Sequence, residues 1–244
     1  MYLAQYTGKG IRIAVIDSGG NAAHPHIVHP RGRYPSGGVS GGLAIREDGS
    51  VSDDDVDRLG HGTAVTAAIR EKAPDAEIVV IKVFWGSLAT DAATLVRAID
   101  EASARGAAVI NLSLGTAETG HRGDLAGAVE RAVNRGALIV SAIEAEGIQW
   151  LPGCLDGVAP VRLDWACARD AYRVVRSDGR AIIATSGYPR DIPGVPRERN
   201  LKGVSFAVAN ATGFIARALE VAAAVSVASV FGTLEAAAGD QTPG

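Results

Sequence analysis

Short apolar runs alternate with segments of helical periodicity along most of this chain, and this alternation constrains its fold more than any other feature. Four runs are strand-like and three segments have helical spacing: Ile11–Ile16, Glu77–Phe84, Ala107–Leu114 and Leu138–Ala142 for the strands, and Ala64–Arg70, Asp91–Arg105 and Asp124–Arg135 for the helices. Strands that alternate with helices form right-handed crossovers, which produce a parallel sheet covered on both faces. The sequence therefore predicts an α/β fold of three layers, in which helices flank a mostly parallel central sheet.

The segment after Pro152 departs from this alternation. Tyr172–Val175 and Ala181–Ala184 flank Ser177-Asp178-Gly179, which predicts a hairpin with a tight turn. A loop rich in Pro, Gly and charged residues is expected at residues 187–203.

An Ala- and Val-rich segment predicts one long helix from Ser205 to about Val230. We find no internal repeat, no low-complexity tract and no interdomain linker. The sequence therefore predicts a single domain over residues 1–244, with a folded core at about 6–238 and a frayed tail at 239–244.

Composition and charge exclude several classes of function. Hydrophobic residues make up 47% of the 244 residues and charged residues 21%, which is typical of a globular domain. The net charge is −3 and no strong Lys/Arg run is present, so neither nucleic acid nor an anionic membrane surface is expected as a partner. Ala218–Val230 is too short to cross a bilayer. The start of the chain lacks the pattern of a signal peptide, which predicts a cytoplasmic protein unless a presequence has been removed.

The cysteines and an acidic run offer weak evidence for metal or disulfide chemistry. Cys154 and Cys167 either form one disulfide or remain two partly buried thiols, and the thiols are favoured because nothing in the sequence indicates secretion. Asp53-Asp54-Asp55 and Asp57 lack the spacing of a calcium loop, so a solvated loop is favoured over a cation site. We expect no metal and no cofactor.

Three separate positions carry residues that act together in nucleophilic catalysis. Asp17 ends a predicted strand, His61 stands between two glycines before a helical segment, and Ser205 begins the long predicted helix. Each has an ordinary interpretation by itself, as a turn residue, a surface histidine or a helix N-cap. A serine hydroxyl, however, needs a base within hydrogen-bond reach, and the base needs an orienting carboxylate. The start of a helix also stabilises a developing oxyanion.

Four ordered motifs resemble the signatures of the subtilisin-like serine proteases. They are Ile13–Gly19, Gly60-His61-Gly62-Thr63, Val109–Gly115 and Gly203-Val204-Ser205-Phe206-Ala207, and the resemblance runs from about Tyr6 to Ala238. It implies a triad in which Ser205 attacks the scissile carbonyl, His61 transfers the proton and Asp17 orients the imidazole. It also implies that the partner is a peptide or protein substrate.

The resemblance implies a substrate-binding region as well. Ser113-Leu114-Gly115 matches the strand that pairs with an extended peptide. Ala142, Glu144 and Trp150 match the surroundings of the pocket for a substrate side chain. Trp150 either narrows this pocket or is a core or rim aromatic, and both interpretations stay open. Glu144 and Glu146 would favour a basic substrate side chain.

One departure from the family pattern concerns the oxyanion hole. Where the family supplies an Asn side chain, this chain has Ala145, and the backbone N–H of Ser205 remains as a donor. Loss of one such donor costs about 10²–10³ in kcat. Two hypotheses therefore stay open: an active endopeptidase, dedicated to the processing of a precursor peptide, and a catalytically weak or inactive peptide-binding protein. Asp17-Ser18-Gly19-Gly20 is not a GxGxxG motif, which excludes a dinucleotide-binding protein. The oligomeric state is unknown.

Overall fold

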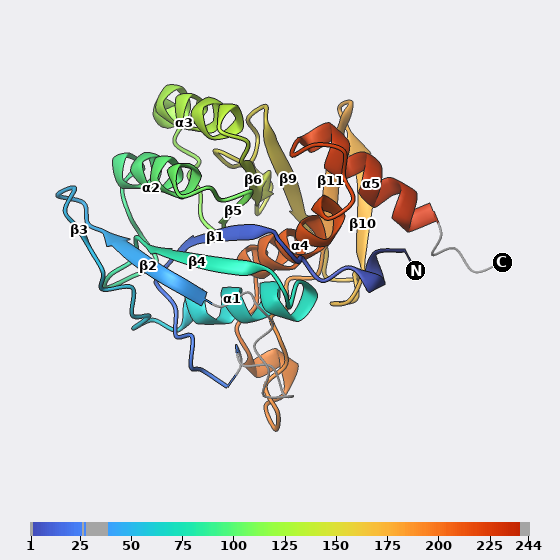
Figure 1. Cartoon of the computed structure of the whole chain (residues 1–244), viewed down its shortest axis with the longest axis horizontal. Helices are drawn as coiled ribbons and strands as arrows, with labels where there is room; N and C mark the ends of the chain where they lie inside the picture. Colours follow the sequence, from blue (N-terminus) through green and yellow to red (C-terminus); the bar gives the residue numbers. More distant parts are fainter. Residues whose placement is uncertain (1, 26, 28–38, 240–244) are drawn as a thin grey trace.

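One extended sheet organises the computed structural model, which describes residues 2–25, 27 and 39–239. Its strands lie in the order β10-β11-β9-β6-β5-β1-β4-β2-β3 (Figure 1). Their bounds are β1 Arg12–Asp17, β2 Val39–Ile45, β3 Val51–Ser52, β4 Glu77–Lys82, β5 Val109–Leu112, β6 Leu138–Ala142, β9 Val158–Leu163, β10 Tyr172–Ser177 and β11 Arg180–Thr185. Neighbouring strands are parallel except at the two edges, where β2–β3 and β10–β11 are antiparallel.

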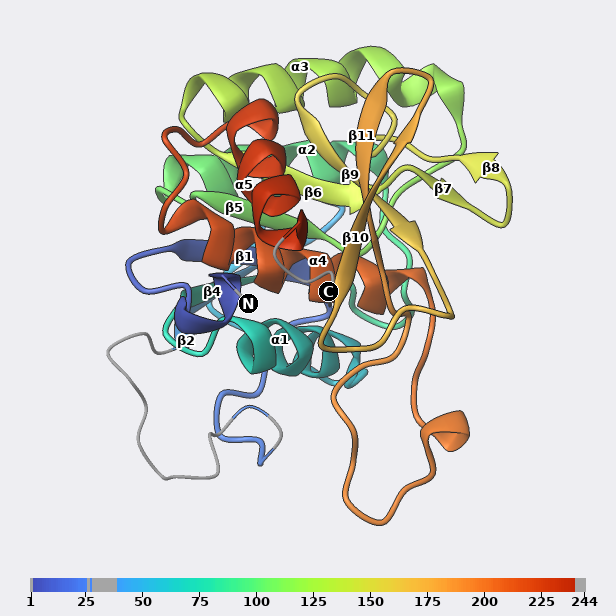
Figure 2. The same ribbon diagram turned by 90° about the vertical axis from the view of Figure 1, so that its right-hand side faces the viewer.

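Helices cover both faces of the sheet (Figures 1 and 2). One face is covered by α1 (His61–Lys72), α4 (Val204–Leu219) and α5 (Val227–Gly239), and the other by α2 (Ala92–Ala104) and α3 (Arg122–Asn134). Each face has its own cluster of buried aliphatic side chains. The predicted three-layer α/β fold with a mostly parallel sheet is confirmed.

The strand β1 shows why the sequence folds into layers. Ile13 and Val15 belong to the core beneath α1 and α4, while Ala14 and Ile16 belong to the core beneath α2 and α3. A strand buried on both faces needs a continuous apolar run, because successive side chains point to opposite faces. The run ends at Asp17, which the strand delivers to the carboxyl edge of the sheet.

The predicted hairpin after Pro152 is confirmed. β10 and β11 pair in antiparallel register with Ser177 opposite Arg180. Asp178 and Gly179 form the two-residue turn with φ values of 50° and 78°, the left-handed conformation that a tight hairpin turn of the primed type requires.

The prediction of one helix from Ser205 to about Val230 is wrong. α4 ends at Leu219, and Glu220 next to it accepts backbone hydrogen bonds from Thr7 and Gly8 near the start of the chain. A new helix, α5, follows Ser226, whose hydroxyl accepts a hydrogen bond from the Ser229 N–H, 3.2 Å away. Neither Gly nor Pro marks the break, so the local sequence did not indicate it.

Some elements were not predicted at all. β2 contains Gly41 and Gly42, and β9 contains Pro160. Both residue types are unfavourable in strands, so the sequence pattern did not indicate these two strands. A separate hairpin of β7 (Glu144–Ala145) and β8 (Ile148–Gln149) was also missed. The tail predicted at 239–244 lies outside the described residues, apart from Gly239 at the end of α5.

Cys154 and Cys167 are both free, as the sequence favoured, and Cys167 is buried. In the part of the chain that the structure describes, no helix is both long enough and apolar enough to span a membrane.

Candidate active site

Asp17 is a buried carboxylate at the centre of the sheet. It is the last residue of β1 and its side chain is fully inaccessible to solvent. The Ser18 N–H donates to its Oδ1 at 2.7 Å, and His61 Nδ1 lies 2.8 and 3.0 Å from its two oxygens. A buried carboxylate keeps its charge only with such partners. Asp17 therefore fixes the plane of the imidazole and leaves Nε2 available on the opposite side.

His61 is the first residue of α1, which begins three residues before the predicted helical segment. Gly62 allows this arrangement: a Cβ there would overlap the Gly19 carbonyl oxygen and lie 3.2 Å from Asp17 Oδ1. The glycine after the histidine thus lets the helix start pack against the end of β1.

The environment of His61 favours its protonated form. Burial alone lowers the pKa of His61, whose side chain is only 11% exposed. The hydrogen bond and charge of Asp17, together with the charge of Asp57, outweigh burial and raise this pKa above its ordinary value of 6.5. The imidazole is consequently a stronger base than a free one, and it becomes neutral only at higher pH.

Ser205 lies in the first turn of α4, after Gly203, whose φ of 145° favours glycine. The imidazole of His61 and the ring of Phe206 are 5.6 Å apart between centroids, so this turn lies beside the histidine. Among the described residues, Ser205 Oγ donates its hydrogen bond to the Ser113 carbonyl oxygen at 3.1 Å, not to His61. The Ser113 hydroxyl in turn donates to the Ser205 carbonyl oxygen at 3.1 Å. The structure brings the two segments together without a hydrogen bond between Ser205 and His61, the last one that the predicted triad requires.

Buried polar side chains hold α4 in this position. The Thr185 hydroxyl donates to the Ala207 carbonyl at 2.7 Å, and Asn210 Nδ2 donates to the Ser186 carbonyl at 2.9 Å. A third contact joins α4 to β5, where an Asn111 amide donates to the Thr212 hydroxyl at 2.9 Å. Because such groups are costly to bury without partners, these bonds define one position of the helix on the sheet.

Ser113–Gly115, which the sequence predicted to pair with the substrate, directly follow the end of β5 at Leu112 and form no strand in the structure. Within the described chain, the backbone groups of Leu114 and Gly115 make no backbone hydrogen bonds. A Cβ on Gly115 would lie 2.6 Å from both Trp150 Cε3 and the Leu151 carbonyl oxygen. The backbone groups of this segment are therefore open for pairing, and Trp150 packs against Gly115.

A cavity of about 800 Å³ lies next to Ser205. Its walls include the β7–β8 hairpin, Trp150 and the two residues before the serine; the lining residues are Ala117, Glu144, Ala145, Glu146, Gly147, Ile148, Trp150, Arg162, Leu163, Trp165, Gly203 and Val204. Trp150 is thus a wall of an open cavity. Ala142 is buried at the end of β6 and is absent from this lining. Ala145 contributes a methyl group and no side-chain donor.

The charge inside this cavity differs from the expectation. Arg162 Nε donates to Glu144 Oε1 at 2.9 Å, and both side chains are about one third exposed. Glu146 lies in the exposed turn of the hairpin, with φ 51°. The ion pair neutralises Glu144, which removes the main basis for the expected preference for a basic substrate side chain.

Asp57 belongs to the site, and the prediction that it lies in a solvated acidic loop is wrong. Its Oδ1 accepts from the Ser18 hydroxyl at 2.9 Å and the Gly60 N–H at 2.8 Å. Its Oδ2 accepts from the Thr63 N–H at 2.8 Å and the Thr63 hydroxyl at 2.6 Å. These bonds satisfy free N–H groups at the start of α1 and hold His61 against Asp17. An aspartate shortly before a helix start was the available signal.

The first prediction concerns the pKa of His61. In Asp17→Asn, this pKa should fall below its value in the unmodified chain, because the charge that outweighs burial is lost. An NMR titration of the imidazole measures it. Asp124→Asn, which removes an exposed carboxylate on α3, is the matched control and should leave the titration of His61 unchanged. An equal pKa in Asp17→Asn would contradict the assignment.

The second prediction concerns Asp57 and stability. Burial alone would raise the pKa of Asp57, but hydrogen bonds from Thr63, Ser18 and Gly60 hold it below 3.8. Its ionised form therefore stabilises the fold above the unfolded pKa of about 3.9, and this contribution is lost as the pH falls through the lower folded pKa. Asp57→Asn should reduce the free energy of unfolding by about 1 kcal/mol at pH 7.

Urea unfolding at a series of pH values measures this difference. The difference in free energy of unfolding between Asp57→Asn and the unmodified chain should become smaller below about pH 4, because the native carboxylate is then being protonated. Asp53→Asn, at an exposed position in the same acidic run, is the control. A difference that is independent of pH would contradict the role of the charge.

The chain is similar in sequence and in fold to known proteins. The sequence model described as the subtilase family matches residues 8–144. Subtilisin E of Bacillus subtilis (strain 168) is 28% identical over 219 residues, which cover 85% of this chain and 52% of that protein. The chain thus spans about half the length of this relative.

Solved structures show the same fold. A cold adapted subtilisin-like serine proteinase superimposes with a TM-score of 0.66 at 20% identity, covering 95% of this chain and 83% of the other. The prenylagaramide maturation protease PagA superimposes with a TM-score of 0.61 at 23% identity, covering 86% of this chain and 76% of the other. The family match over residues 8–144, which is more than half of the sequence, and this shared architecture lead to one conclusion: the chain belongs to the subtilase family.

Proposed function

We propose that this chain is a serine endopeptidase with Asp17, His61 and Ser205 as its catalytic triad. The observation that carries the proposal is the buried hydrogen-bonded pair of Asp17 and His61 beside the helix turn that bears Ser205. A charged carboxylate behind an imidazole is the arrangement that a hydroxyl nucleophile needs.

The reaction begins with a movement of the serine side chain. Ser205 Oγ turns from the Ser113 carbonyl toward His61 Nε2, which takes its proton as the oxygen attacks the scissile carbonyl. The imidazolium, held by Asp17, then protonates the leaving amine and the peptide bond breaks. Water attacks the remaining ester, gives a proton to His61 and releases the carboxylic acid, and the proton returns to Ser205.

The oxyanion that forms in each half of the reaction meets the N–H groups at the start of α4. Ala145 offers no second donor from its side chain. We therefore expect kcat to be about 10²–10³ below that of a site with a side-chain donor. This feature favours a slow, dedicated protease over a rapid digestive one.

The substrate is an extended peptide that pairs with Ser113–Gly115. Cavities on two sides of this segment support the binding mode. Gly115 and its neighbours line a second cavity of about 360 Å³, and Gly115 also packs against Trp150, a wall of the first cavity. The apolar lining of the larger cavity and its neutralised Glu144 favour an uncharged side chain before the scissile bond.

The finer proposal is that the chain processes a precursor peptide. The fold likeness to a protein named as a maturation protease supports it. A selective pocket and a slow reaction are both compatible with a protease that cleaves one substrate at a single peptide bond.

The alternative is a catalytically weak or inactive peptide-binding protein. Two features favour it: the resemblance to the family puts Ala145 where an Asn donor is expected, and Ser205 donates its hydrogen bond to Ser113. The open segment and the cavity would serve peptide binding equally well in such a protein.

The third prediction separates these two functions. A fluorophosphonate probe should label Ser205 in the unmodified chain, because His61 and Asp17 activate its hydroxyl. Peptide mapping by mass spectrometry locates the label, which should be lost in His61→Ala. Ser113→Ala is the matched control for an adjacent hydroxyl and should still be labelled at Ser205. An unlabelled but folded native chain would favour the binding protein.

The fourth prediction concerns the pocket. Arg162→Met should leave Glu144 unpaired beside the bound side chain, so preference should shift toward Lys or Arg before the scissile bond. The ratio of kcat/KM for basic over apolar peptides should rise about tenfold, which corresponds to one charge-assisted hydrogen bond. Arg173→Met, which removes an exposed arginine paired with Asp164, is the control. Profiling with a peptide library measures the shift, and an unchanged preference would contradict the assigned pocket.

A further inference from the structure

A third cavity, lined by cations, lies far from the proposed catalytic residues. It has a volume of about 430 Å³ and lies between the end of α1, the end of α4 and the loop around Arg169. Four of its lining residues are cations: Lys72, Arg169, Arg197 and Arg217. Arg217 is in the last turn of α4 and Ser205 in the first, about 18 Å apart along an axis that rises about 1.5 Å per residue.

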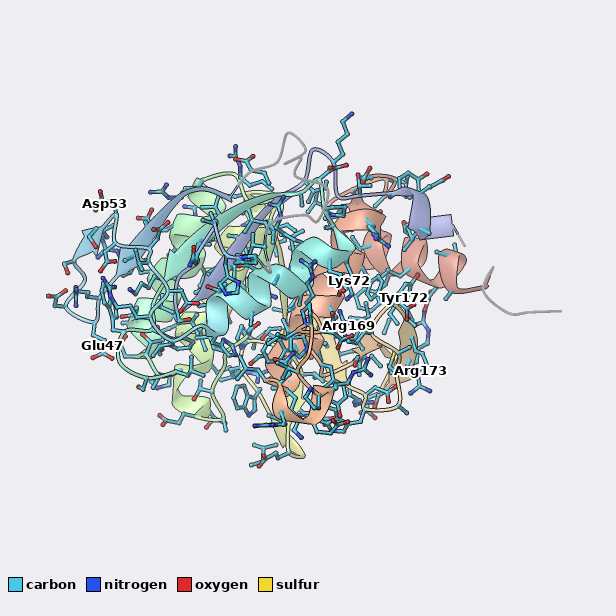
Figure 3. The ribbon with its side chains drawn as sticks, turned by 90° about the horizontal axis from the view of Figure 1, so that it is seen from below. Glu47, Asp53, Lys72, Arg169, Tyr172 and Arg173 are labelled. Carbon is cyan, nitrogen blue, oxygen red and sulfur yellow. The ribbon has the colours of Figure 1, made fainter. Side chains whose placement is uncertain are left out.

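The carboxylates around this cavity, Glu71 and Asp191, each pair with two of its cations. Lys72 Nζ and Arg169 Nη2 donate to the same oxygen of Glu71, and Figure 3 shows Lys72 and Arg169 labelled where α1 ends. Arg169 Nη1 donates to Asp191 Oδ2 at 2.9 Å, and Arg197 Nε lies 3.5 Å from Asp191 Oδ1. Three cations therefore depend on two carboxylates, and the remaining carboxylate of the lining, Asp170, is exposed.

Arg217 has no ion pair within the described chain. Glu220, the carboxylate whose charge acts on it, accepts hydrogen bonds from the Thr7 and Gly8 backbone. Among the residues that the structure describes, neither the buried Nε of Arg217 nor that of Arg169 has a hydrogen-bond partner. Unpaired buried donors of charged groups are costly, and both belong to side chains that line the same cavity.

The cations also repel one another. Burial lowers the pKa of Lys72, and the charges of Arg169 and Arg217 lower it further, against the opposing effect of Glu71. A group with negative charge in the cavity would remove this repulsion. Guanidinium groups suit such a ligand because their planar donors match the oxygens of a carboxylate or phosphate.

We propose that this cavity binds an oxoanion, held by Arg217 and Arg169 with Lys72 behind them. The shared ligand chemistry is a compact group with two or three negatively charged oxygens. Free phosphate supplies it, and so does the carboxylate of an acidic peptide side chain. The site does not depend on the chemistry of Ser205, because Lys72 and Arg217 lie at the ends of α1 and α4 opposite to His61 and Ser205.

The fifth prediction tests the site with inorganic phosphate. Calorimetric titration at constant ionic strength, with chloride as the balancing anion, should give saturable binding to the unmodified chain. Arg217→Gln should weaken the affinity about tenfold, as expected for loss of one charge-assisted contact. Arg176→Gln, which removes an exposed arginine paired with Glu235, is the matched control and should bind normally. Absence of saturable binding, or equal losses in both variants, would overturn the proposal.

Stability provides a second readout that a purely structural arginine would not give. In chloride alone, Arg217→Gln should unfold at the same or a higher temperature, because a partly buried charge without a partner has been removed. Phosphate should raise the unfolding temperature of the unmodified chain but not of this variant. A lower unfolding temperature in chloride would count against the proposal. If Arg217→Gln does not fold, Arg217→Lys replaces it; unchanged phosphate affinity in that variant would also count against it.

A competition experiment identifies the source of the oxoanion. The Ser205→Ala chain, which removes cleavage, is loaded with phosphate and titrated with a short peptide that contains Asp and Glu. Displacement by this peptide, but not by its Asn and Gln counterpart, assigns the site to peptide carboxylates. Phosphate that binds and resists displacement assigns it to free anions. Either result supports an oxoanion site.

Discussion

The hydrogen bond between the Asp17 carboxylate and His61 Nδ1 is the interaction on which the rest of the site depends. Asp17 is fully buried at the end of β1, inside the sheet, where an ionised carboxylate is stable only if nearby donors replace water. The start of α1 supplies those donors, and Gly62 permits the close approach. Asp57 then holds the helix start from the other side. The geometry of the base is therefore fixed by the same contacts that let a charge exist inside the sheet.

The nucleophile is positioned by a different set of contacts. Polar side chains of β5 and β11 bond to α4 across its buried face, so the helix cannot slide or rotate freely on the sheet. Ser205 itself is held by a reciprocal pair of hydrogen bonds with Ser113, on the segment that we assign to the substrate. This hydrogen bond links substrate binding to the proposed catalysis. A peptide that pairs with the Ser113 segment lies beside the Ser205 hydroxyl, which must turn toward His61. Catalytic hydrogen bonds that tighten only in the complex are common in unliganded sites.

Two cavities place charge in contrasting ways. Beside Ser205, one cation and one anion, Arg162 and Glu144, neutralise each other in a mainly apolar pocket. At the far end of α4, cations outnumber the carboxylates that pair with them, and Arg217 is left without an ion pair among the described residues. The first arrangement suits an uncharged side chain and the second an oxoanion. Both follow from side chains that meet only because the layers pack together.

The sequence by itself determined the layered α/β fold, the hairpin of β10 and β11 and the three residues of the proposed triad. These features are written in local patterns: apolar period, turn residues, and short motifs around Asp17, His61 and Ser205. Tertiary structure alone decided the break between α4 and α5, where Glu220 bonds to the start of the chain. It also decided the capping role of Asp57, the pairing of Glu144 with Arg162 and the cationic cavity. The physical reason is that the ion-pair or hydrogen-bond partner of a charge or of a helix end can be distant in the sequence, and only the folded chain brings the two groups together.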